Sequence, residues 1–551
     1  MVGHELNAVV EEKVKRARKG VSKSKTGCFT CRVRHIKCDE TRPSCIRCTE
    51  TGRQCDYLNP ALAVPPPPKP VKRLSSLSNQ QISPSTSSNS DSIKTVIMPP
   101  RLRLYPRILP QLHPEEIQNF DYFQNVCAKD FAGYFQGSLW EKLVLRTAYE
   151  EPCIRHAVVA LGSLHRAQTY PADIRNNISA PDSSVRYYRK AIVTLNQRLE
   201  SCSMSWELAI LSSLIFLAHE LLLGHDAVAF MHLKSGFRML KAIRDHFTQY
   251  SADGKIIATN PSACALSGNL HDLVNAFARL DVQAATFEKA YKPNNFRTVT
   301  LPDRFTSVLQ ARDALNSILA AMYSLLQQNR ELIKKTLPYI PLPAETAIEV
   351  EQIKTLLNRW SDLFTLFSKQ NQVSPKQQMS IDILVIQRMA AWIHISTFFN
   401  QDQLSYDFYY SSFEQIVDLA KKVSSIDKDN KTSGSRFSLD VGLIQPLLYV
   451  ATHCRDPSLR RQAIKIMNGL GREGLYEGPS SAAVAKWVVK MEEDGMGHGF
   501  VREEKRFHGE LATVFDNIKR TFQVTGTRRN CDGVWEHVNE HAMWEVHSVT
   551  L

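Results

Sequence analysis

The sequence predicts a small metal-stabilised module near the N-terminus, a disordered Pro/Ser-rich linker, and a large all-α domain. Six cysteines between Cys28 and Cys55 follow the pattern C-x2-C-x6-C-x6-C-x2-C-x6-C. From Asn59 to about Pro100 the composition changes to proline, serine and threonine, which is typical of a linker without a packed core. Beyond the linker, apolar residues recur at helical spacing with almost no period-two alternation, so we expect little β-sheet.

The cysteine spacing is one half-motif written twice, and each Cys-x-x-Cys pair can hold a metal ion from one side. Zinc takes four ligands in a tetrahedron, so two ions need eight ligand positions. Six cysteines suffice if two thiolates bridge both ions, and the repeat nominates the first cysteine of each half, Cys28 and Cys45, as the bridges. The sequence therefore predicts two Zn2+ ions held by Cys28, Cys31, Cys38, Cys45, Cys48 and Cys55.

Other uses of these cysteines fit the sequence less well. A disulfide framework suits a small secreted domain, but the N-terminus is polar and basic and lacks an apolar signal segment. A thioredoxin-like Cys-x-x-Cys would stand alone beside a βαβ pattern, whereas here two pairs lie among basic residues. An iron–sulfur site would leave two cysteines over.

The segment resembles the fungal binuclear zinc-cluster transcription factors, and the match covers all six cysteines and the residues between them. The family's basic residues, the acidic residue after the third cysteine and the loop proline are matched by Arg32, Arg34, Lys37, Asp39 and Pro43. One departure is His35, which stands where a second consecutive lysine or arginine is usual.

The resemblance implies double-stranded DNA as partner, with a short helix in the major groove reading a CGG-type triplet. Carried over, that helix spans roughly Arg32 to Lys37. Arg34 and His35 are then candidates for guanine N7 and O6, because this edge of guanine presents two acceptors. Arg32, Lys37 and Arg47 are expected on phosphates.

The net charge of +13 is concentrated near the N-terminus. Residues 1–103 hold 19 Lys/Arg against 8 Asp/Glu, and residues 13–37 hold ten basic residues and no acidic one. Such a block is attracted to phosphates. We interpret residues 1–25 as a basic, mostly disordered arm that tracks phosphates and directs the chain to the nucleus. The other six cysteines are scattered singly, as expected of free thiols in a reducing, intracellular compartment.

We place the zinc-cluster DNA-binding domain at 26–58, the linker at 59–100 and an all-helical regulatory domain at 101–551. Expected helices start at Pro152 and at Asp456-Pro457, and a central buried helix runs from Trp206 to a stop at Gly224. The polar stretches near 250–262 and 424–438 are expected to be loops. No stretch reaches the roughly 20 apolar residues that span a membrane, so we expect no membrane partner.

The region after the linker also resembles the middle homology domain of the same family, through EPCIRHAVVALGSLHRA, YYRKAIVTLNQRL, FLAHELLLGHDAVAFMHLKSGFRML and ATHCRDPSLRRQAIKIMNGLGREGLYEG. This resemblance implies a regulatory domain rather than an enzyme, with the transcription machinery as partner. A homodimer and a small-molecule effector are further candidate partners. No run of three heptads supports a coiled-coil dimer.

Two strings resemble functional motifs, but the first lacks a required residue and the second lacks the required structural context. His219-Glu220 would need a second histidine at position 223 to form a zinc-protease helix, and that residue is Leu223. The G-x-G-x-x-G string from Gly469 to Gly474 follows a helix rather than a strand, so it is expected to end a helix and not to bind a dinucleotide. His219 is expected to be a hydrogen-bonded core residue.

Other functional classes remain open at this stage. A metal-buffering protein would need the cysteines but not the roughly 450 residues that follow them. A single-stranded RNA binder would want interleaved aromatic residues for base stacking, and residues 13–37 contain only Phe29. A ligand receptor is compatible with DNA binding, because the helical domain could hold an effector.

Overall fold

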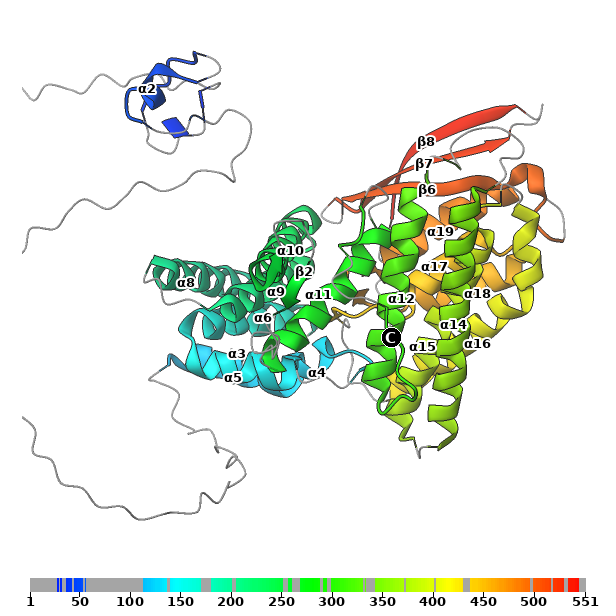
Figure 1. The fold of residues 1–551 in the computed structure, drawn as a ribbon, viewed down its shortest axis with the longest axis horizontal. Helices are drawn as coiled ribbons and strands as arrows, with labels where there is room; N and C mark the ends of the chain where they lie inside the picture. Colours follow the sequence, from blue (N-terminus) through cyan, green and yellow to red (C-terminus); the bar gives the residue numbers. More distant parts are fainter. Residues whose placement is uncertain are drawn as a thin grey trace, which may run out of the picture. The chain divides into compact units, whose positions relative to one another are not determined.

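A computed structural model of the chain separates into two compact units, Met1–Arg103 and Leu104–Leu551 (Figure 1). The predicted basic arm and the predicted linker lie outside the residues that the structure describes. Those residues are 27–28, 30–31, 36–41, 44–52, 55, 112–135, 139–169, 180–200, 205–250, 256–259, 268–287, 291–294, 299–330, 332, 342–370, 373–400, 403–429, 437–495, 499–516, 519–529 and 534–544.

The first unit has a core made of cysteine. Five of its six cysteines are buried in one cluster, and Cys55 packs against them. The isoleucines that the structure describes here, Ile36 and Ile46, are 37% and 50% exposed. Because so little apolar surface is buried, a metal ion must supply most of the folding free energy of this unit.

The second unit is mostly helical, as the sequence predicts, and it contains two large hydrophobic clusters. The first cluster lies among the elements up to α11, with Phe437, Leu439 and Leu475 joining from later in the chain. These elements are α3 Pro114–Tyr122, η2 Phe123–Cys127, α4 Ala128–Phe131, η3 Leu139–Val144, α5 Leu145–Glu150, α6 Pro152–Thr169, α8 Ala180–Glu200, α9 Trp206–Leu223, α10 Asp226–Phe247, β1 Thr248–Tyr250, β2 Ile256–Thr259 and α11 Gly268–Phe287.

The second cluster is built mainly from the helices that follow α11. Trp360 is fully buried within it and donates its indole N–H to the carbonyl of Ala311 at 2.8 Å. The elements of this half are α12 Val308–Gln328, α14 Ala344–Gln370, α15 Pro375–Thr397, η4 Gln403–Tyr409, α16 Tyr410–Asp429, β3 Phe437–Ser438, α17 Ile444–His453, α18 Pro457–Asn468, β4 Arg472–Glu473, β5 Tyr476–Glu477, α19 Gly478–Glu493 and η5 Glu503–Lys505.

Local chemistry sets the ends of the predicted helices. The Ser205 hydroxyl accepts from the N–H of Leu208 at the start of α9, and Gly224 ends that helix in the left-handed conformation, with φ of 77°. Asp456 caps α18 by accepting from the N–H groups of Ser458 and Leu459, with Pro457 in the first turn. These starts and stops agree with the sequence prediction.

Helix α9 is the central buried helix that the sequence predicts. It has 18 residues and a mean hydropathy of 1.6, so its length and composition alone would suit a membrane span, but 78% of it is buried inside the unit. The Ser212 hydroxyl donates a hydrogen bond to the carbonyl of Leu208 at 2.7 Å, and the Ser213 hydroxyl donates to the carbonyl of His232 on α10. The helix is apolar all round because other helices cover it.

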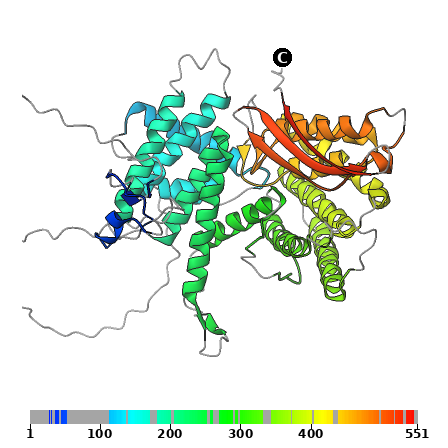
Figure 2. The ribbon, with the colours of Figure 1, turned by 90° about the horizontal axis from the view of Figure 1, so that it is seen from above.

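The chain ends in a three-stranded antiparallel sheet that the sequence analysis missed (Figure 2). Its strands are β6 Phe507–Asp516, β7 Thr521–Arg529 and β8 Trp535–Met543, in the order β6-β7-β8. Phe522 and Val524 of β7 are buried and lie in one cluster with Val484 of α19. Strand β7 thus carries a short period-two alternation. Strand β8 is mostly exposed and polar, and its pairing with β7 is what defines it.

Two further loop predictions need correction. Helix α16 continues to Asp429, so residues 424–429 are helical rather than loop. Strands β1 and β2 form a hairpin across part of the 250–262 stretch. Both segments are polar, and polarity alone does not distinguish a solvated helix or hairpin from a loop.

The C-terminal sheet is joined to the helices by a buried ionic network. Arg460 of α18 donates to Glu492 of α19 at 2.6 Å, and Arg506 lies 3.5 Å from the same carboxylate. All three residues are at most 1% exposed. Glu492 also accepts from the N–H of Phe507 at 2.9 Å, where β6 begins.

The same two arginines cap the C-terminal end of α17. Arg506 donates to the carbonyls of Thr452, His453 and Cys454, and Arg460 donates to that of Ala451. The last carbonyls of a helix carry partial negative charge and lack partners within the helix, so a cation is stabilising there. One network therefore fixes α17, α18, α19 and the start of the sheet together.

His453, at this helix end, is expected to make the unit sensitive to acid. Burial first, and then the charge of Arg506, lower the pKa of His453 to about 3. An unfolded histidine titrates near 6.5, so between pH 6.5 and 3 the unfolded chain binds a proton that the folded chain does not. As the pH is lowered through this window, the free energy of unfolding should therefore decrease, by up to about 1.4 kcal/mol per pH unit from this residue.

Urea unfolding of wild type and His453→Gln at several pH values between 7.5 and 5 tests this expectation. The variant should have the shallower dependence on pH. Parallel curves for the two proteins would show that His453 titrates alike in the folded and unfolded states.

Candidate zinc centre and nucleic-acid interface

Four thiol groups from the two halves of the repeat converge on one point. The sulfur atoms of Cys28, Cys31, Cys45 and Cys48 all lie within 4.8 Å of one another. The Sγ of Cys28 lies 3.6 Å from that of Cys45 and 3.7 Å from that of Cys48, and the Sγ of Cys31 lies 3.6 Å from that of Cys45. A disulfide needs an S–S distance of about 2 Å, so these are free thiols that face one another.

The two halves also make the same backbone contacts. The N–H of Cys28 donates to the Sγ of Cys38 at 3.4 Å, and the N–H of Cys45 donates to the Sγ of Cys55 at 3.1 Å. In each half, the backbone N–H of the first cysteine is therefore hydrogen-bonded to the sulfur of the third. The sequence repeat is thus a structural repeat, which brings all six predicted metal ligands into one cluster.

These distances fit tetrahedral thiolate coordination of zinc. A Zn–S bond of about 2.3 Å gives a tetrahedron whose sulfur atoms are about 3.8 Å apart. The separations of 3.6 to 3.7 Å between thiols that would share an ion lie close to that edge length. Burial raises the pKa of the Cys28 and Cys45 thiols, so a cation is required to hold these groups as thiolates.

Cys28 and Cys45 each contact thiols of both halves. Cys28 lies near Cys31 in its own half and near Cys45 and Cys48 in the other half. Cys45 lies near Cys48 in its own half, near Cys28 and Cys31, and within 4.8 Å of Cys38. Cys31 and Cys48 also lie near thiols of both halves, so these distances agree with bridging by Cys28 and Cys45 without singling them out.

Asp39 joins the two halves in a way that the cysteine pattern does not reveal. Its carboxylate accepts from the N–H groups of Ile46 at 3.0 Å and Arg47 at 3.2 Å, at the start of α2 Ile46–Thr49. The Thr41 hydroxyl donates to the same carboxylate, and these hydrogen bonds lower the pKa of Asp39. Asp39 therefore acts as the N-terminal cap of a helix in the other half. The sequence showed only an acidic residue after Cys38.

Of the predicted DNA-contacting residues, Lys37 and Arg47 are described by the structure. Both are exposed, next to the buried Cys38 and Cys48 respectively, so their charges are available to a phosphate backbone. Arg32, Arg34 and His35, which include both predicted base-reading residues, lie outside the described residues.

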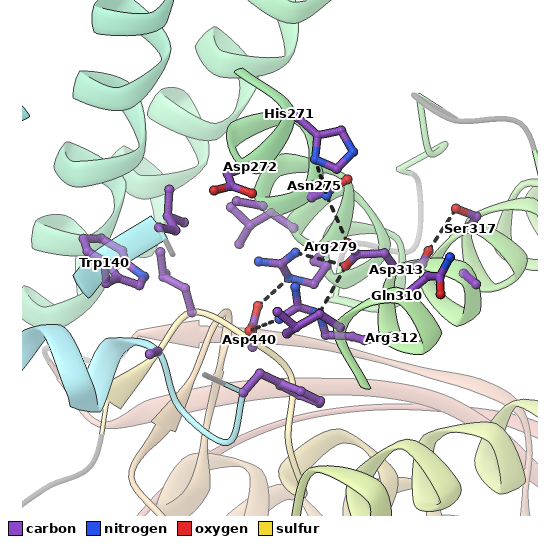
Figure 3. Close-up of a pocket in the computed structure, with 18 of the residues that line it drawn as sticks. Trp140, His271, Asp272, Asn275, Arg279, Gln310, Arg312, Asp313, Ser317 and Asp440 are labelled. Carbon is purple, nitrogen blue, oxygen red and sulfur yellow. Dashed lines mark hydrogen bonds and ion pairs between the residues drawn. The ribbon is translucent and has the colours of Figure 1, made fainter. Parts of the chain in front are cut away.

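The helical unit contains a cavity of about 1000 Å³ that sequence reasoning did not locate (Figure 3). One part of its lining is a paired set of charges: Arg279 of α11 lies 2.6 Å from Asp440 and 3.5 Å from Asp313, and Arg312 lies 3.2 Å from Asp440 and 3.1 Å from Asp313. The apolar part of the lining includes Leu139, Trp140, Leu214, Leu280, Leu301 and Leu309.

These four charged residues come from α11, α12 and the segment between β3 and α17, so the cavity lies where three parts of the unit meet. Asp440 is held by both arginines, and they lower its pKa against the opposing effect of burial. The two arginines and the two aspartates neutralise one another. The lining as a whole thus combines an apolar part with this polar part.

The two catalytic look-alikes have structural roles. His219 is buried, stacks on Tyr188 with ring centroids 4.2 Å apart, and has Nε2 2.9 Å from the Ser184 hydroxyl. It is the hydrogen-bonded core residue that the sequence predicts. Gly469 follows the end of α18, and Gly474 lies in the turn between β4 and β5, with φ of 57°. The glycine string is therefore a helix end and a hairpin turn.

Comparison with protein families gives two matches. The model of the "Fungal specific transcription factor domain" matches residues 119–490, which is more than half of the chain. The model of the "Fungal Zn(2)-Cys(6) binuclear cluster domain" matches residues 26–62 and includes all six clustered cysteines. No solved structure matches the chain significantly.

Curated relatives match over different extents. The chain is 23% identical to the aspercryptin biosynthesis cluster-specific transcription regulator of Emericella nidulans, over 86% of this chain and 88% of that protein. It is 28% identical to a Zn(2)-C6 fungal-type transcription factor of Aspergillus fumigatus, over 31% of this chain and 39% of the relative. It is 60% identical to the transcriptional regulatory protein moc3 of Schizosaccharomyces pombe, over 7% of this chain and 8% of the relative.

Proposed function

This chain belongs to the fungal-specific zinc-cluster transcription factors, and from this premise we propose that its N-terminal module binds CGG-type triplets in double-stranded DNA in the nucleus. The observation that carries the proposal is the convergence of the cysteine thiols at 3.6 to 3.9 Å beside the exposed Lys37 and Arg47. The function itself is DNA-dependent regulation of transcription by RNA polymerase II, with the transcription machinery as partner.

The metal content that we propose is two Zn2+ ions per chain. Each ion would be held by the three cysteines of one half and by the first cysteine of the other half. Cys28 and Cys45 would thus serve both ions, which agrees with their contacts to thiols of both halves. The ions supply folding free energy, and the protein's own part is to hold the basic side chains at fixed positions around them.

DNA recognition would divide between base reading and phosphate contact. Arg34 and His35 are proposed to donate to guanine, while Arg32, Lys37 and Arg47 contact phosphates. The Asp39 cap fixes the first turn of α2 against the other half of the module. Because one of its hydrogen bonds is to the backbone N–H of Arg47, the cap also fixes the backbone from which the exposed Arg47 side chain extends.

His35 offers a sharp test of base reading. His35→Ala should weaken binding to a CGG-containing duplex by about 1–3 kcal/mol and weaken binding to a random duplex much less, because a base contact contributes only on the correct sequence. Lys37→Ala, the matched control, should weaken both duplexes to a similar extent and reduce the salt dependence by about one contact.

Fluorescence-anisotropy titrations with both duplexes over a range of salt concentrations would measure these effects. Equal losses on the specific and random duplexes for His35→Ala would contradict base reading by this residue. Failure of wild type to prefer any CGG-containing duplex over random sequence would contradict the proposed specificity.

We further propose that the helical domain senses a small-molecule effector in the cavity of Figure 3. Its volume of about 1000 Å³ is at the upper end of the range for small-molecule sites, and its apolar lining with a few polar groups is typical of them. Arg279 and Asp440 link α11 to the segment before α17 across this cavity. A ligand that favours one arrangement of this link would shift the balance between conformations of the domain.

Thermal unfolding with a library of small neutral molecules tests the effector proposal. A true ligand should raise the melting temperature of wild type, because it binds only the folded state. The shift should disappear in Leu309→Trp, which fills the cavity from α12, and should persist in Trp206→Leu, which changes an exposed residue at the start of α9. Ligands that stabilise wild type and Leu309→Trp equally would place effector binding elsewhere.

A further inference from the structure

A second hollow of the helical unit is strongly basic. It is a groove of about 1080 Å³ along helices α18 and α19, which pack against each other. Arg461 and Lys465 line it from α18, and Lys486 and Lys490 line it from α19. Each pair is spaced i, i+4, so each helix presents two cations about 6 Å apart along its axis on one face.

Three of the four cations in this groove have no ion-pair partner among the described residues. Lys465, Lys486 and Lys490 are exposed and make no ion pair among the described residues. Arg461 is paired with Glu493 at 2.5 Å. The remaining carboxylate of the lining, Asp456, accepts from the first N–H groups of α18. Three lysines on two helices therefore line the same groove, and none is ion-paired to a residue that the structure describes.

The groove also has apolar surface. Ile464 and Val489 line the groove and are 6% and 8% exposed. Phe500 also lines the groove. It is 54% exposed and makes an edge-to-face contact with Tyr410 at a centroid distance of 6.1 Å. An exposed phenylalanine beside lysine side chains, whose stems are themselves apolar, gives an apolar strip flanked by positive charge.

The groove is preformed. On the side of the helices away from solvent, Arg460 of α18 is joined to Glu492 of α19 by the buried ionic network described above. The two walls are therefore fixed relative to each other, so a ligand would lose little free energy in ordering them.

We propose that this groove is a docking site for an acidic, amphipathic helical segment of a partner protein. Carboxylates at i, i+4 spacing would pair with Lys465, Lys486 and Lys490, and an apolar side chain would pack against Phe500. Helices are commonly recognised in this way, with their apolar face in a groove and their charges at its rim.

Nucleic acid is a less suitable occupant. The exposed ring of Phe500 offers nothing to a phosphate backbone, so nucleic acid would leave the apolar part of the lining unused. A peptide with alternating acidic and apolar groups uses both parts of the lining. The inference concerns a surface remote in sequence from the zinc centre and does not depend on the DNA-binding proposal.

Fluorescence anisotropy on the full chain with a labelled synthetic helix tests the proposal. The probe carries glutamates at i, i+4 positions on both sides of a leucine and phenylalanine stripe. Lys465→Glu/Lys486→Glu/Lys490→Glu should weaken its binding at least tenfold, because each reversal converts attraction into repulsion. Phe500→Ser should weaken it severalfold. These side chains are exposed, so the variants should fold normally.

A matched control changes the same net charge elsewhere. Lys142→Glu/Lys369→Glu/Lys376→Glu replaces three exposed lysines outside the groove and should leave probe binding within about twofold of wild type. Equal losses in the two triple variants would overturn the proposal, because attraction would then depend on net charge alone. If a probe with glutamine in place of glutamate bound as tightly, the proposal would be overturned in favour of an apolar site. If the groove variant alone lost affinity for a random DNA duplex, it would be overturned in favour of a nucleic-acid site.

Discussion

Replacing Cys45 by alanine is expected to remove both zinc ions from the N-terminal module and to abolish sequence-specific DNA binding. Cys45 contacts thiols of both halves, so its loss would remove one ligand from each proposed site at once. The core of this unit consists of cysteines, and no other buried apolar cluster in its described residues would hold the two halves together without metal. Metal analysis of the purified full-length chain should show that the zinc content falls from two ions per chain in wild type to nearly none in Cys45→Ala.

Cys55→Ala is the matched control, because Cys55 would serve one ion only. We expect this variant to keep more zinc and more of its specific DNA affinity than Cys45→Ala. Circular dichroism of both variants should show nearly the helical signal of wild type, since the helices of residues 112–495 have their own core. One zinc ion per wild-type chain, or equal zinc loss in the two variants, would contradict bridging by Cys45.

Replacing Glu492 by alanine is expected to cost the helical unit about 3–5 kcal/mol of unfolding free energy, which is the range for breaking a buried ion pair from one side. The change would leave Arg460 and Arg506 without their shared carboxylate while both are at most 1% exposed. It would also remove the acceptor of the Phe507 N–H at the start of β6. Chemical denaturation followed by circular dichroism measures the effect.

The pair Glu351–Lys354 on α14 provides the comparison, because the Glu351 side chain is 69% exposed and Glu351→Ala should change stability by less than about 0.5 kcal/mol. Glu492→Gln should lie between the two, since it keeps a hydrogen-bond acceptor but loses the charge. If Glu492→Ala cost no more than Glu351→Ala, the network would not be what joins the sheet to the helices. Selective loss of β6–β8 protection in hydrogen exchange would locate the damage.

Several features follow from the sequence alone because local chemistry determines them. The spacing of Cys28 to Cys55 predicts a metal cluster, since a thiolate pair two residues apart can reach one ion whatever surrounds it. The helix start at Pro457 and the stop at Gly224 depend on capping groups that lie within a few residues, and Pro152 is itself the first residue of α6. The apolar residues of α9 predict a buried helix, because no solvated face remains.

Other features depend on residues that are distant in the sequence. Asp39 and α2, or Arg460, Glu492 and Arg506, look in the sequence like ordinary charged surface residues, and only the packing of different elements brings them together. Strand β8 is exposed and polar, so pairing with β7 defines it and its own pattern does not. The cavity beside Arg279 and the groove beside Lys486 likewise exist only between elements. The sequence by itself determined the zinc-binding module and the helical class, whereas the tertiary structure decided which charges are buried in pairs and which remain available to a partner.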